Sequence, residues 1–413
     1  MSGDSEETSQ AGNSTLVLVA LFSSVLVVGV AFAGIVPWIS LALERRGVDP
    51  TTIGIVAAAS PVGIMIMAPF VGRVMQALGT ANAIMLGAGI ASVTILLLPV
   101  FDGTLQWIAL RFIGGLASAL PWVATETWIN TVASSRSRGR VVAVYVAFLS
   151  LGYSGGPLVL SLVGIEGWRP ILLFVALELL AIIPTFAIRH YSPRLEVEAR
   201  LPIVSAILAM PAVFAAAYVA GMVDTGFLAF LPIWGLRIGL EHGYALLLLT
   251  VFIAGNVVLP LPAGWLADRV GTRPVMALCG VISILGPLAV VYAVSWPVLL
   301  GIVLFIWGGA AFSLYSLAMT DIGHYCRGTQ LAAASGALVV VYTISNIAGP
   351  PVIGAAMEAW GPHALMAVSA GVAALFMGVL ALTARSAAPE LPPEDMALSD
   401  EADPASGHER REP

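Results

Sequence analysis

Twelve apolar runs, each about as long as a membrane-crossing helix, constrain the fold of this chain more than any other feature. A helix needs roughly 20 apolar residues to cross the hydrocarbon core of a bilayer. Of the 413 residues, 59% are hydrophobic and only 10% are charged, which leaves too much apolar surface for a water-soluble domain to bury. We predict spans at 16–42, 53–78, 83–101, 106–131, 141–163, 168–188, 203–231, 244–263, 274–293, 297–320, 329–356 and 363–384.

The second half of the chain repeats features of the first at nearly constant spacing. The segment G-R-V-M-Q-A-L-G-T at 72–80 corresponds to G-W-L-A-D-R-V-G-T at 264–272. The glycine–proline pair at 156–157 likewise corresponds to a glycine–proline pair at 349–350. Parallel repeats in an apolar chain are typical of one transporter architecture. We therefore predict an all-α membrane protein with twelve transmembrane helices in two pseudo-symmetric six-helix bundles. The expected divisions are a cytoplasmic tail at 1–15, bundles at 16–188 and 203–385, a cytoplasmic linker at 189–202, and a disordered acidic cytoplasmic tail at 386–413.

The segment G-W-L-A-D-R-V-G-T-R at 264–273 resembles the signature of the major facilitator superfamily (MFS). In that family it lies between helices 2 and 3 and again between helices 8 and 9, and it latches the two bundles together on the cytoplasmic side. Gln76 replaces the expected carboxylate in the first copy, so we predict a charged latch only in the second. The alternative is that both segments are simple basic turns. The resemblance implies gating roles for Gly72, Arg73, Gly79, Gly264, Asp268, Arg269, Gly271 and Arg273.

Within the second copy we expect Asp268 to follow the end of helix 8, where its carboxylate could cap the N-terminus of a neighbouring helix or pair with Arg269 or Arg273. We expect Gly264 to allow close helix contact and Gly271 to form a tight turn.

Helix 4 carries a second family resemblance. Arg111 begins an R-x-x-x-G pattern similar to the MFS helix-4 motif, whose arginine is often linked to proton coupling. The E-x-W-x-N segment that starts at Glu126 resembles a bacterial subset of the family with no agreed substrate. Carboxylates near a membrane exit favour ion pairs with arginines of the next loop. The predicted gate pairs are Glu126 with Arg136 or Arg138, and Asp321 with Arg327.

Helices 5 and 11 carry glycine–proline motifs that indicate close packing or bending. Gly152, Gly156 and Pro157 resemble a motif of MFS exporters, and Gly349 and Pro350 form its fuller counterpart in helix 11. The alternative is ordinary packing of membrane helices.

Ionisable groups inside a membrane are costly and indicate function by default. Asp224, placed in the outer half of helix 7, is the predicted coupling carboxylate, because helices 1, 4, 7 and 10 line the cavity in the resembling family. A structural hydrogen bond is the alternative. Arg111 lies at similar depth, and we expect the two groups to approach each other when the outer side closes. Glu178, on a supporting helix, is expected to be protonated and packed.

Aromatic residues suggest an apolar cavity wall that suits amphipathic molecules better than sugars. At most half of the candidates should face inward, the rest packing or anchoring at the interfaces. The candidates are Trp38, Trp122, Trp128, Trp234 and Tyr315.

Arginine placement predicts the orientation. With an internal N-terminus, ten arginines fall in inner loops and four in outer loops, which places both termini in the cytoplasm. We therefore expect a multi-pass protein of a bacterial inner membrane, monomeric, with the lipid bilayer, protons and a small-molecule substrate as its partners. We expect no enzyme activity, cofactor, metal site or nucleic-acid binding. The predicted function is secondary transport, first as proton-coupled export. The alternatives are proton-linked uptake and a non-transporting membrane sensor or scaffold.

Overall fold

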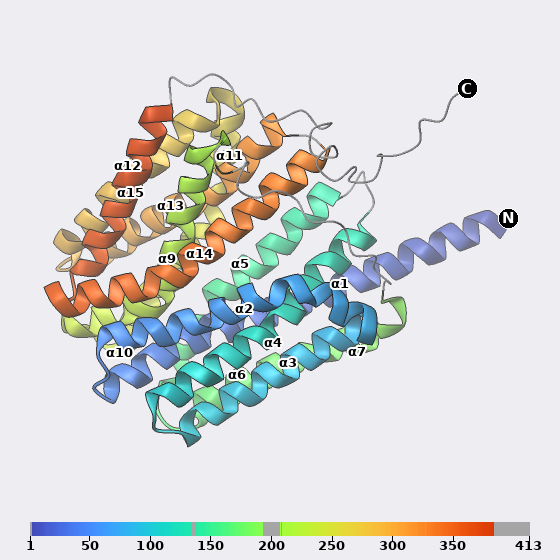
Figure 1. Cartoon of the computed structure of the whole chain (residues 1–413), viewed down its shortest axis with the longest axis horizontal. Coiled ribbons are helices and arrows are strands. Elements are labelled where there is room, and N and C mark those ends of the chain that lie inside the picture. Colours follow the sequence, from blue (N-terminus) through green and yellow to red (C-terminus); the bar gives the residue numbers. More distant parts are fainter. Residues whose placement is uncertain (1, 134–137, 193–206, 208, 327, 384–413) are drawn as a thin grey trace, which may run out of the picture.

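The computed structural model describes residues 2–133, 138–192, 207, 209–326 and 328–383. Its helices pack as two bundles that lie side by side, one from each half of the chain (Figure 1). The helices are α1 (Ser2–Arg45), α2 (Pro50–Leu78), α3 (Thr80–Leu97), α4 (Thr104–Val132), α5 (Arg138–Val163), α6 (Arg169–Leu180), α7 (Ile182–Ala187), α9 (Pro211–Arg237), α10 (His242–Val258), α11 (Pro260–Val270), α12 (Thr272–Ala293), α13 (Pro297–Tyr325), α14 (Gly328–Trp360) and α15 (Ala364–Leu382).

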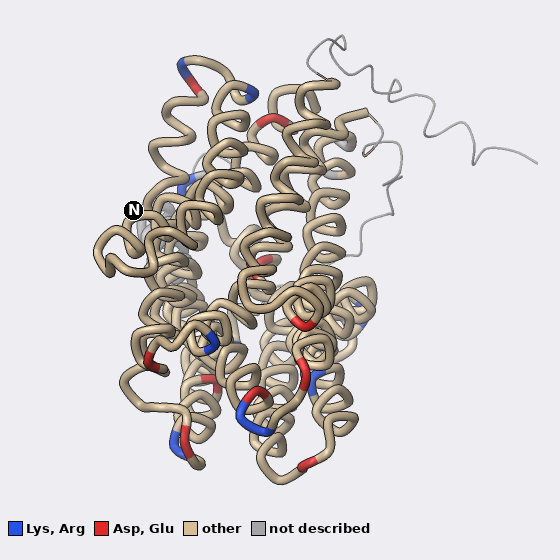
Figure 2. The backbone as a smooth tube through the Cα atoms, turned by 90° about the vertical axis from the view of Figure 1, so that its left-hand side faces the viewer, with Lys and Arg blue, Asp and Glu red and all other residues tan. Residues whose placement is uncertain are grey.

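Twelve spans within the described residues are long and apolar enough to cross a membrane, as the sequence predicts. Two of them are made of consecutive α-helices, α6 with α7 and α10 with α11, and the third span continues from α3 into the short 3-10 helix η1 (Leu98–Val100). We call the end where α1 begins and α15 ends the termini face, and the other end the opposite face. Figure 2, seen from the left-hand side of Figure 1, shows how few charged positions occur along the helices.

The seventh span differs most from its prediction. It runs over Pro211–Arg237 rather than 203–231, because Pro211 begins the helix and the apolar run continues past Trp234. The span is also the most buried of the twelve, with 78% of its most apolar stretch inside the protein. Asp224 therefore lies at the centre of α9, not in its outer half, and the residues around it are enclosed by other helices.

The two signature segments are mainly helical, which corrects the prediction of loops. Gly72, Arg73 and Gln76 lie within α2, and Asp268 lies within α11 rather than after the end of the helix. Each helix ends at a glycine of positive φ, Gly79 at 85° and Gly271 at 91°. Both glycines donate a 2.8 Å backbone hydrogen bond to the carbonyl four residues earlier. The predicted tight turn is thus made at a single glycine, with the same backbone conformation and hydrogen bond in both copies.

The bundles meet mainly where α2 packs against α14, α5 against α10, and α1 against α9, with a smaller contact between α2 and α9. Where α2 crosses α14 the backbones nearly touch: a Cβ added at Gly54 would lie 2.3 Å from the Pro350 carbonyl oxygen. A Cβ added at Gly354 would lie 2.2 Å from the carbonyl oxygen of Pro50. Small residues allow this approach where lipid gives helices no hydrophobic reason to associate.

Polar contacts join the bundles at the opposite face. Arg237 at the end of α9 donates two hydrogen bonds to Glu44 of α1, of 2.7 and 2.9 Å. Thr51 at the start of α2 donates to Glu358 of α14. The bundles are therefore held together at the opposite face by both ionic and backbone contacts.

Candidate functional site

The Asp224 carboxylate forms the centre of a polar cluster inside the protein. Tyr342 of α14 donates a 2.8 Å hydrogen bond to it. The next residue, Thr225, donates 2.7 Å to the side-chain oxygen of Asn346, one turn further along α14. Two adjacent residues of α9 are thus tied to two residues of α14 that share one helix face.

Aromatic rings extend this cluster toward both bundles. The Tyr315 ring of α13 packs edge-on against Tyr342, with 4.9 Å between centroids. Tyr153 of α5, in the other bundle, interacts electrostatically with both Asp224 and Tyr342. Asp224 therefore lies at the junction of the two bundles.

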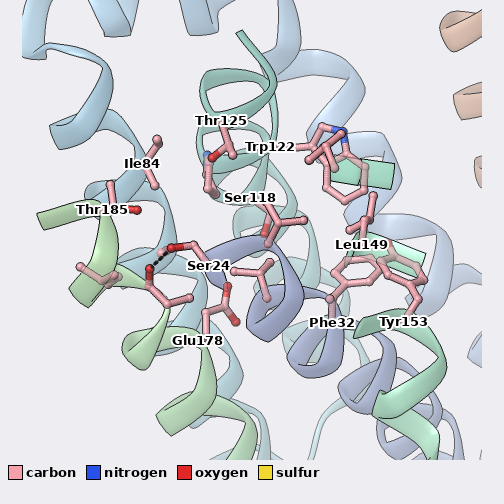
Figure 3. Close-up of a pocket in the computed structure, with 18 of the residues that line it drawn as sticks. Ser24, Phe32, Ile84, Ser118, Trp122, Thr125, Leu149, Tyr153, Glu178 and Thr185 are labelled. Carbon is pink, nitrogen blue, oxygen red and sulfur yellow. Dashed lines mark hydrogen bonds between the residues drawn. The ribbon is translucent and has the colours of Figure 1, made fainter. Parts of the chain in front are cut away.

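A pocket opens beside this cluster within the N-terminal bundle (Figure 3). It encloses about 800 Å³ of space, part of which is open to solvent. Tyr153 and Phe32, whose rings lie 5.6 Å apart, form one side. The pocket is lined by Ser24, Val25, Val28, Gly29, Phe32, Ile64, Ile84, Ala88, Ser118, Pro121, Trp122, Thr125, Tyr145, Leu149, Tyr153, Glu178, Ala181, Ile182 and Thr185.

Glu178 of α6, expected from the sequence to be protonated and packed, is buried with 8% of its surface exposed but lies on the wall of this pocket, and its protonation stays a prediction. Arg111 of α4, 7% exposed, interacts electrostatically with Glu178. Its Nε is buried without a hydrogen-bond partner. Arg111 thus interacts with Glu178 of its own bundle. Among the described residues, no interaction between Arg111 and Asp224 is found. The approach of Arg111 to Asp224 therefore stays a prediction, and the carboxylate that acts on Arg111 in this structure is Glu178.

The predicted aromatic wall divides into two groups. Trp38, Trp128 and Trp234 are almost fully buried and packed. Trp122 is 37% exposed and lines the pocket, and Tyr315 contacts the Asp224 cluster.

The second signature segment makes no ion pair through Asp268 in the described residues. The Arg269 guanidinium stacks on Trp265 at 3.4 Å from the ring centroid. Arg273 donates 3.1 Å to the Thr383 carbonyl, just past α15. An added Cβ at Gly264 would meet nothing within 4 Å, so the close helix contact predicted there is absent in this conformation. In the first copy, Arg73 lies over Phe70.

The predicted gate pairs fall partly beyond the described residues. Arg136 and Arg327 and the side chain of Arg138 are outside them, so neither pair can be placed. Asp321 is buried and accepts a hydrogen bond from Thr272, the residue after the second signature glycine. Glu126 is exposed, and its charge acts on Tyr145 and, across the bundle boundary, on Tyr315.

The glycine–proline motifs mediate packing in two different ways. A Cβ at Gly152 or Gly156 would strike the α1 backbone, so the helix-5 motif packs α5 against α1 within one bundle. Gly349 faces Met222 of α9, while Pro350 faces Gly54 across the bundle boundary. Pro157 lies within α5.

Several residues of the site were missed by the sequence analysis. Tyr342 and Asn346 lie on α14, which is not one of the four helices expected to line the cavity. Two polar side chains one helical turn apart in an otherwise apolar helix were the signal that could have identified them. Glu44 and Arg237 were not among the predicted site residues, because their pairing across the bundles depends on packing that sequence spacing does not reveal.

The fold and this central polar cluster define a class: membrane proteins of twelve helices, in two halves, with a site between the halves. The Major Facilitator Superfamily model matches residues 21–250 and 239–410, and the chain belongs to this family.

Among curated proteins, an uncharacterized MFS-type transporter YcaD of Escherichia fergusonii is 26% identical over 367 residues, covering 88% of this chain and 95% of its own length. The YcaD of Escherichia coli O6:K15:H31 is 24% identical over 362 residues, covering 87% of this chain and 94% of its own length.

Solved structures share the fold at low identity. The nucleoside transporter NupG is 14% identical with a TM-score of 0.72, covering 91% of this chain and all of its own. A D-xylose-proton symporter is 14% identical with a TM-score of 0.73, covering 92% and 98%. A bacterial homolog of human Spinster, in an inward-facing and occupied conformation, is 14% identical with a TM-score of 0.71, covering 89% and 97%. The chain is therefore an MFS transporter of a bacterial membrane.

Proposed function

We propose that this transporter moves a small organic molecule by alternating access and couples that movement to protons through Asp224. The observation that carries the proposal is the position of this carboxylate at the bundle junction, bonded to Tyr342 and facing Tyr153 of the other bundle. A group at this junction changes its surroundings whenever the bundles rock, so its proton affinity differs between the two conformations.

Two observations support the directions of transport that we propose. The helix-5 motif that includes Gly152 and Gly156 resembles that of exporters, which supports proton-coupled export with both termini in the cytoplasm. The D-xylose-proton symporter among the similar structures supports uptake as the second candidate. In the proposed orientation the closed opposite face corresponds to an inward-facing carrier. Exchange of protons and substrate in liposomes separates both candidates from a sensor that does not transport.

The test uses purified protein in proteoliposomes, with a substrate first found by ligand-induced thermal shift across a small-molecule library. Asp224→Asn is expected to abolish accumulation driven by a pH gradient, because the amide cannot take up the proton, while counterflow exchange continues. Asp102→Asn, a fully exposed carboxylate on the opposite face, is the control and should behave as wild type. If Asp224→Asn still concentrates the substrate under a pH gradient, the coupling role of Asp224 is refuted.

A further inference from the structure

The pocket in the N-terminal bundle carries a single formal charge on its wall. Its lining residues all come from α1 to α7, and Glu178 is the only Asp, Glu, Lys, Arg or His among them. The rest of the wall is apolar, aromatic or hydroxyl-bearing. A ligand inside the pocket therefore meets one carboxylate and no cation.

The Glu178 carboxylate has no direct partner within the described residues. Although the side chain is more than nine-tenths buried, it makes no hydrogen bond, and no ion pair of 4.0 Å or less joins it to Arg111. Ser24, its neighbour in Figure 3, is occupied elsewhere, because its hydroxyl donates to the carbonyls of Ala181 and Ala20. Burying a charged carboxylate without a partner is costly, so a cationic donor that enters the pocket and pairs with Glu178 would offset that cost.

Arg111 does not supply the missing partner. Its charge acts on Glu178 from a distance, and it does not line the pocket. A donor that enters the pocket can approach the carboxylate more closely than the guanidinium does, and the Coulomb attraction grows as that distance falls.

The aromatic wall matches the same kind of ligand. Phe32, Tyr153, Trp122 and Tyr145 all line the pocket, and Figure 3 shows the first three on the side away from Glu178. Ring faces attract cations and pack against apolar bodies. We propose that this pocket binds an organic cation, with Glu178 as the counter-ion of its ammonium group and the aromatic side chains around its apolar body. The inference rests on the proposed function only in treating this cation as the transported molecule.

A matched pair of probes tests the charge preference directly. The full-length protein in detergent is titrated by calorimetry with 4-phenylbutylammonium, which carries both a positive charge and N–H donors, and with the neutral 4-phenyl-1-butanol. The wild type is expected to bind the cation at least tenfold more tightly than the alcohol. Glu178→Gln should weaken cation binding at least tenfold and change alcohol binding less than twofold. Glu166→Gln, an exposed carboxylate on the opposite face, is the control and should leave both affinities unchanged.

A measurement on the unmodified protein keeps the proposal testable if Glu178→Gln does not fold. Labelling of Glu178 by dicyclohexylcarbodiimide, followed by mass spectrometry, should be slowed by the cation and not by the alcohol. Equal affinity for the two probes, or unchanged cation binding by Glu178→Gln, overturns the proposal.

The outcome also separates this inference from the coupling role of Asp224. Asp224→Asn is expected to keep cation binding while losing gradient-driven transport. Loss of cation binding in Asp224→Asn but not in Glu178→Gln would place the cation at the bundle junction and overturn the pocket. Gradient-driven transport by Asp224→Asn would refute only the coupling role.

Discussion

At the scale of single residues, one hydrogen bond connects the central carboxylate of α9 to α14 within the C-terminal bundle. Tyr342 holds Asp224 in place at 2.8 Å, and a hydrogen bond to a group that can be charged contributes about 1.5–3 kcal/mol. Tyr342→Phe keeps the ring and removes the donor. We expect gradient-driven transport to fall about tenfold while the amount of folded protein stays the same, measured in proteoliposomes. Tyr292→Phe, which alters an 86% exposed tyrosine, should change neither quantity.

Residual transport equal to that of the wild type in Tyr342→Phe would mean that Asp224 is positioned by other contacts. The Thr225–Asn346 hydrogen bond, on the neighbouring position of α9, is the contact to remove next.

The start of α2 offers a residue-scale prediction outside the membrane. The Asp49 carboxylate accepts a 2.8 Å hydrogen bond from the Thr52 backbone N–H, and this bond lowers the pKa of Asp49 below its usual value. Because the folded pKa is the lower one, the stabilisation is present above the unfolded pKa of about 3.9 and is lost as pH falls through the folded pKa. Asp49→Ala should cost about 1 kcal/mol at neutral pH.

The measurement is the thermal unfolding midpoint of wild type and Asp49→Ala between pH 7 and pH 3. The difference between the two proteins should shrink below about pH 4, where the wild-type carboxylate becomes protonated. Asp49→Asn, which retains a capping oxygen, should lose less at neutral pH. A difference that is the same at every pH would exclude the charged cap as its cause.

At the scale of elements, the crossing of α2 and α14 depends on the absence of side chains at two glycines. Gly354→Ala would place a methyl group against the Pro50 carbonyl of the other bundle, and backbone cannot yield as a flexible side chain can. We expect a loss of about 1–3 kcal/mol, as for other overpacked sites, seen as a lower thermal unfolding midpoint. Gly336→Ala lies on the same helix, where an added Cβ meets nothing within 4 Å, and should be neutral or stabilising.

If both variants have a lower unfolding midpoint, the cause is a weaker α14 helix and not the crowding between the bundles. Equal midpoints would show that the bundles can separate at this crossing without cost.

Among the helices, the sequence predicted the membrane spans well and the structure of the second signature segment poorly. The twelve spans could be predicted because the length of an apolar run is set by the bilayer, whatever the helices pack against. The helical signature segment from Gly264 to Asp268 could not, since Pro260 and the glycine resemble helix breakers, whereas in a membrane neighbouring helices satisfy the backbone around such residues.

The site was less predictable than the spans. Asp224 was recognisable as a charge in an apolar run. Its partners Tyr342 and Tyr153 were not, because which face of α14 or α5 turns inward is decided by packing between the bundles. The pocket around Glu178 depends in the same way on how α1, α4 and α6 pack.

At the scale of the whole molecule, the two faces carry contacts that should bias the conformation in opposite directions. The opposite face is closed by the two-pronged Glu44–Arg237 ion pair, with side chains 18% and 29% exposed, and by Thr51 with Glu358. At the termini face, Asp268 makes no ion pair in the described residues, while Arg269 and Arg273 contact Trp265 and Thr383. Polar contacts thus join the bundles at the opposite face, whereas Asp268 forms no such contact among the described residues, and we expect the two sets of residues to act as opposed latches.

Because a carrier alternates between two states, removing a contact shifts the population toward the state that lacks it. Glu44→Gln should favour the state open at the opposite face. Asp268→Asn should favour the state seen here, since the proposed latch of the signature segment forms only when the termini face closes. Each shift is expected to be on the order of 1–3 kcal/mol. Gln76→Asn, in the first signature copy, removes no charge and is the control for Asp268→Asn.

Accessibility of single introduced cysteines to a membrane-impermeant maleimide, with Cys279 and Cys326 replaced by serine, measures both shifts. A cysteine at Ser118, in the pocket, reports whether the cavity is reached from the termini face. Labelling from that face should decrease in Glu44→Gln and increase or stay maximal in Asp268→Asn. Arg237→Gln removes the same ion pair and should therefore change the labelling as Glu44→Gln does. The double variant should change the labelling little further. Shifts in the same direction for Glu44→Gln and Asp268→Asn would rule out opposed latches at the two faces.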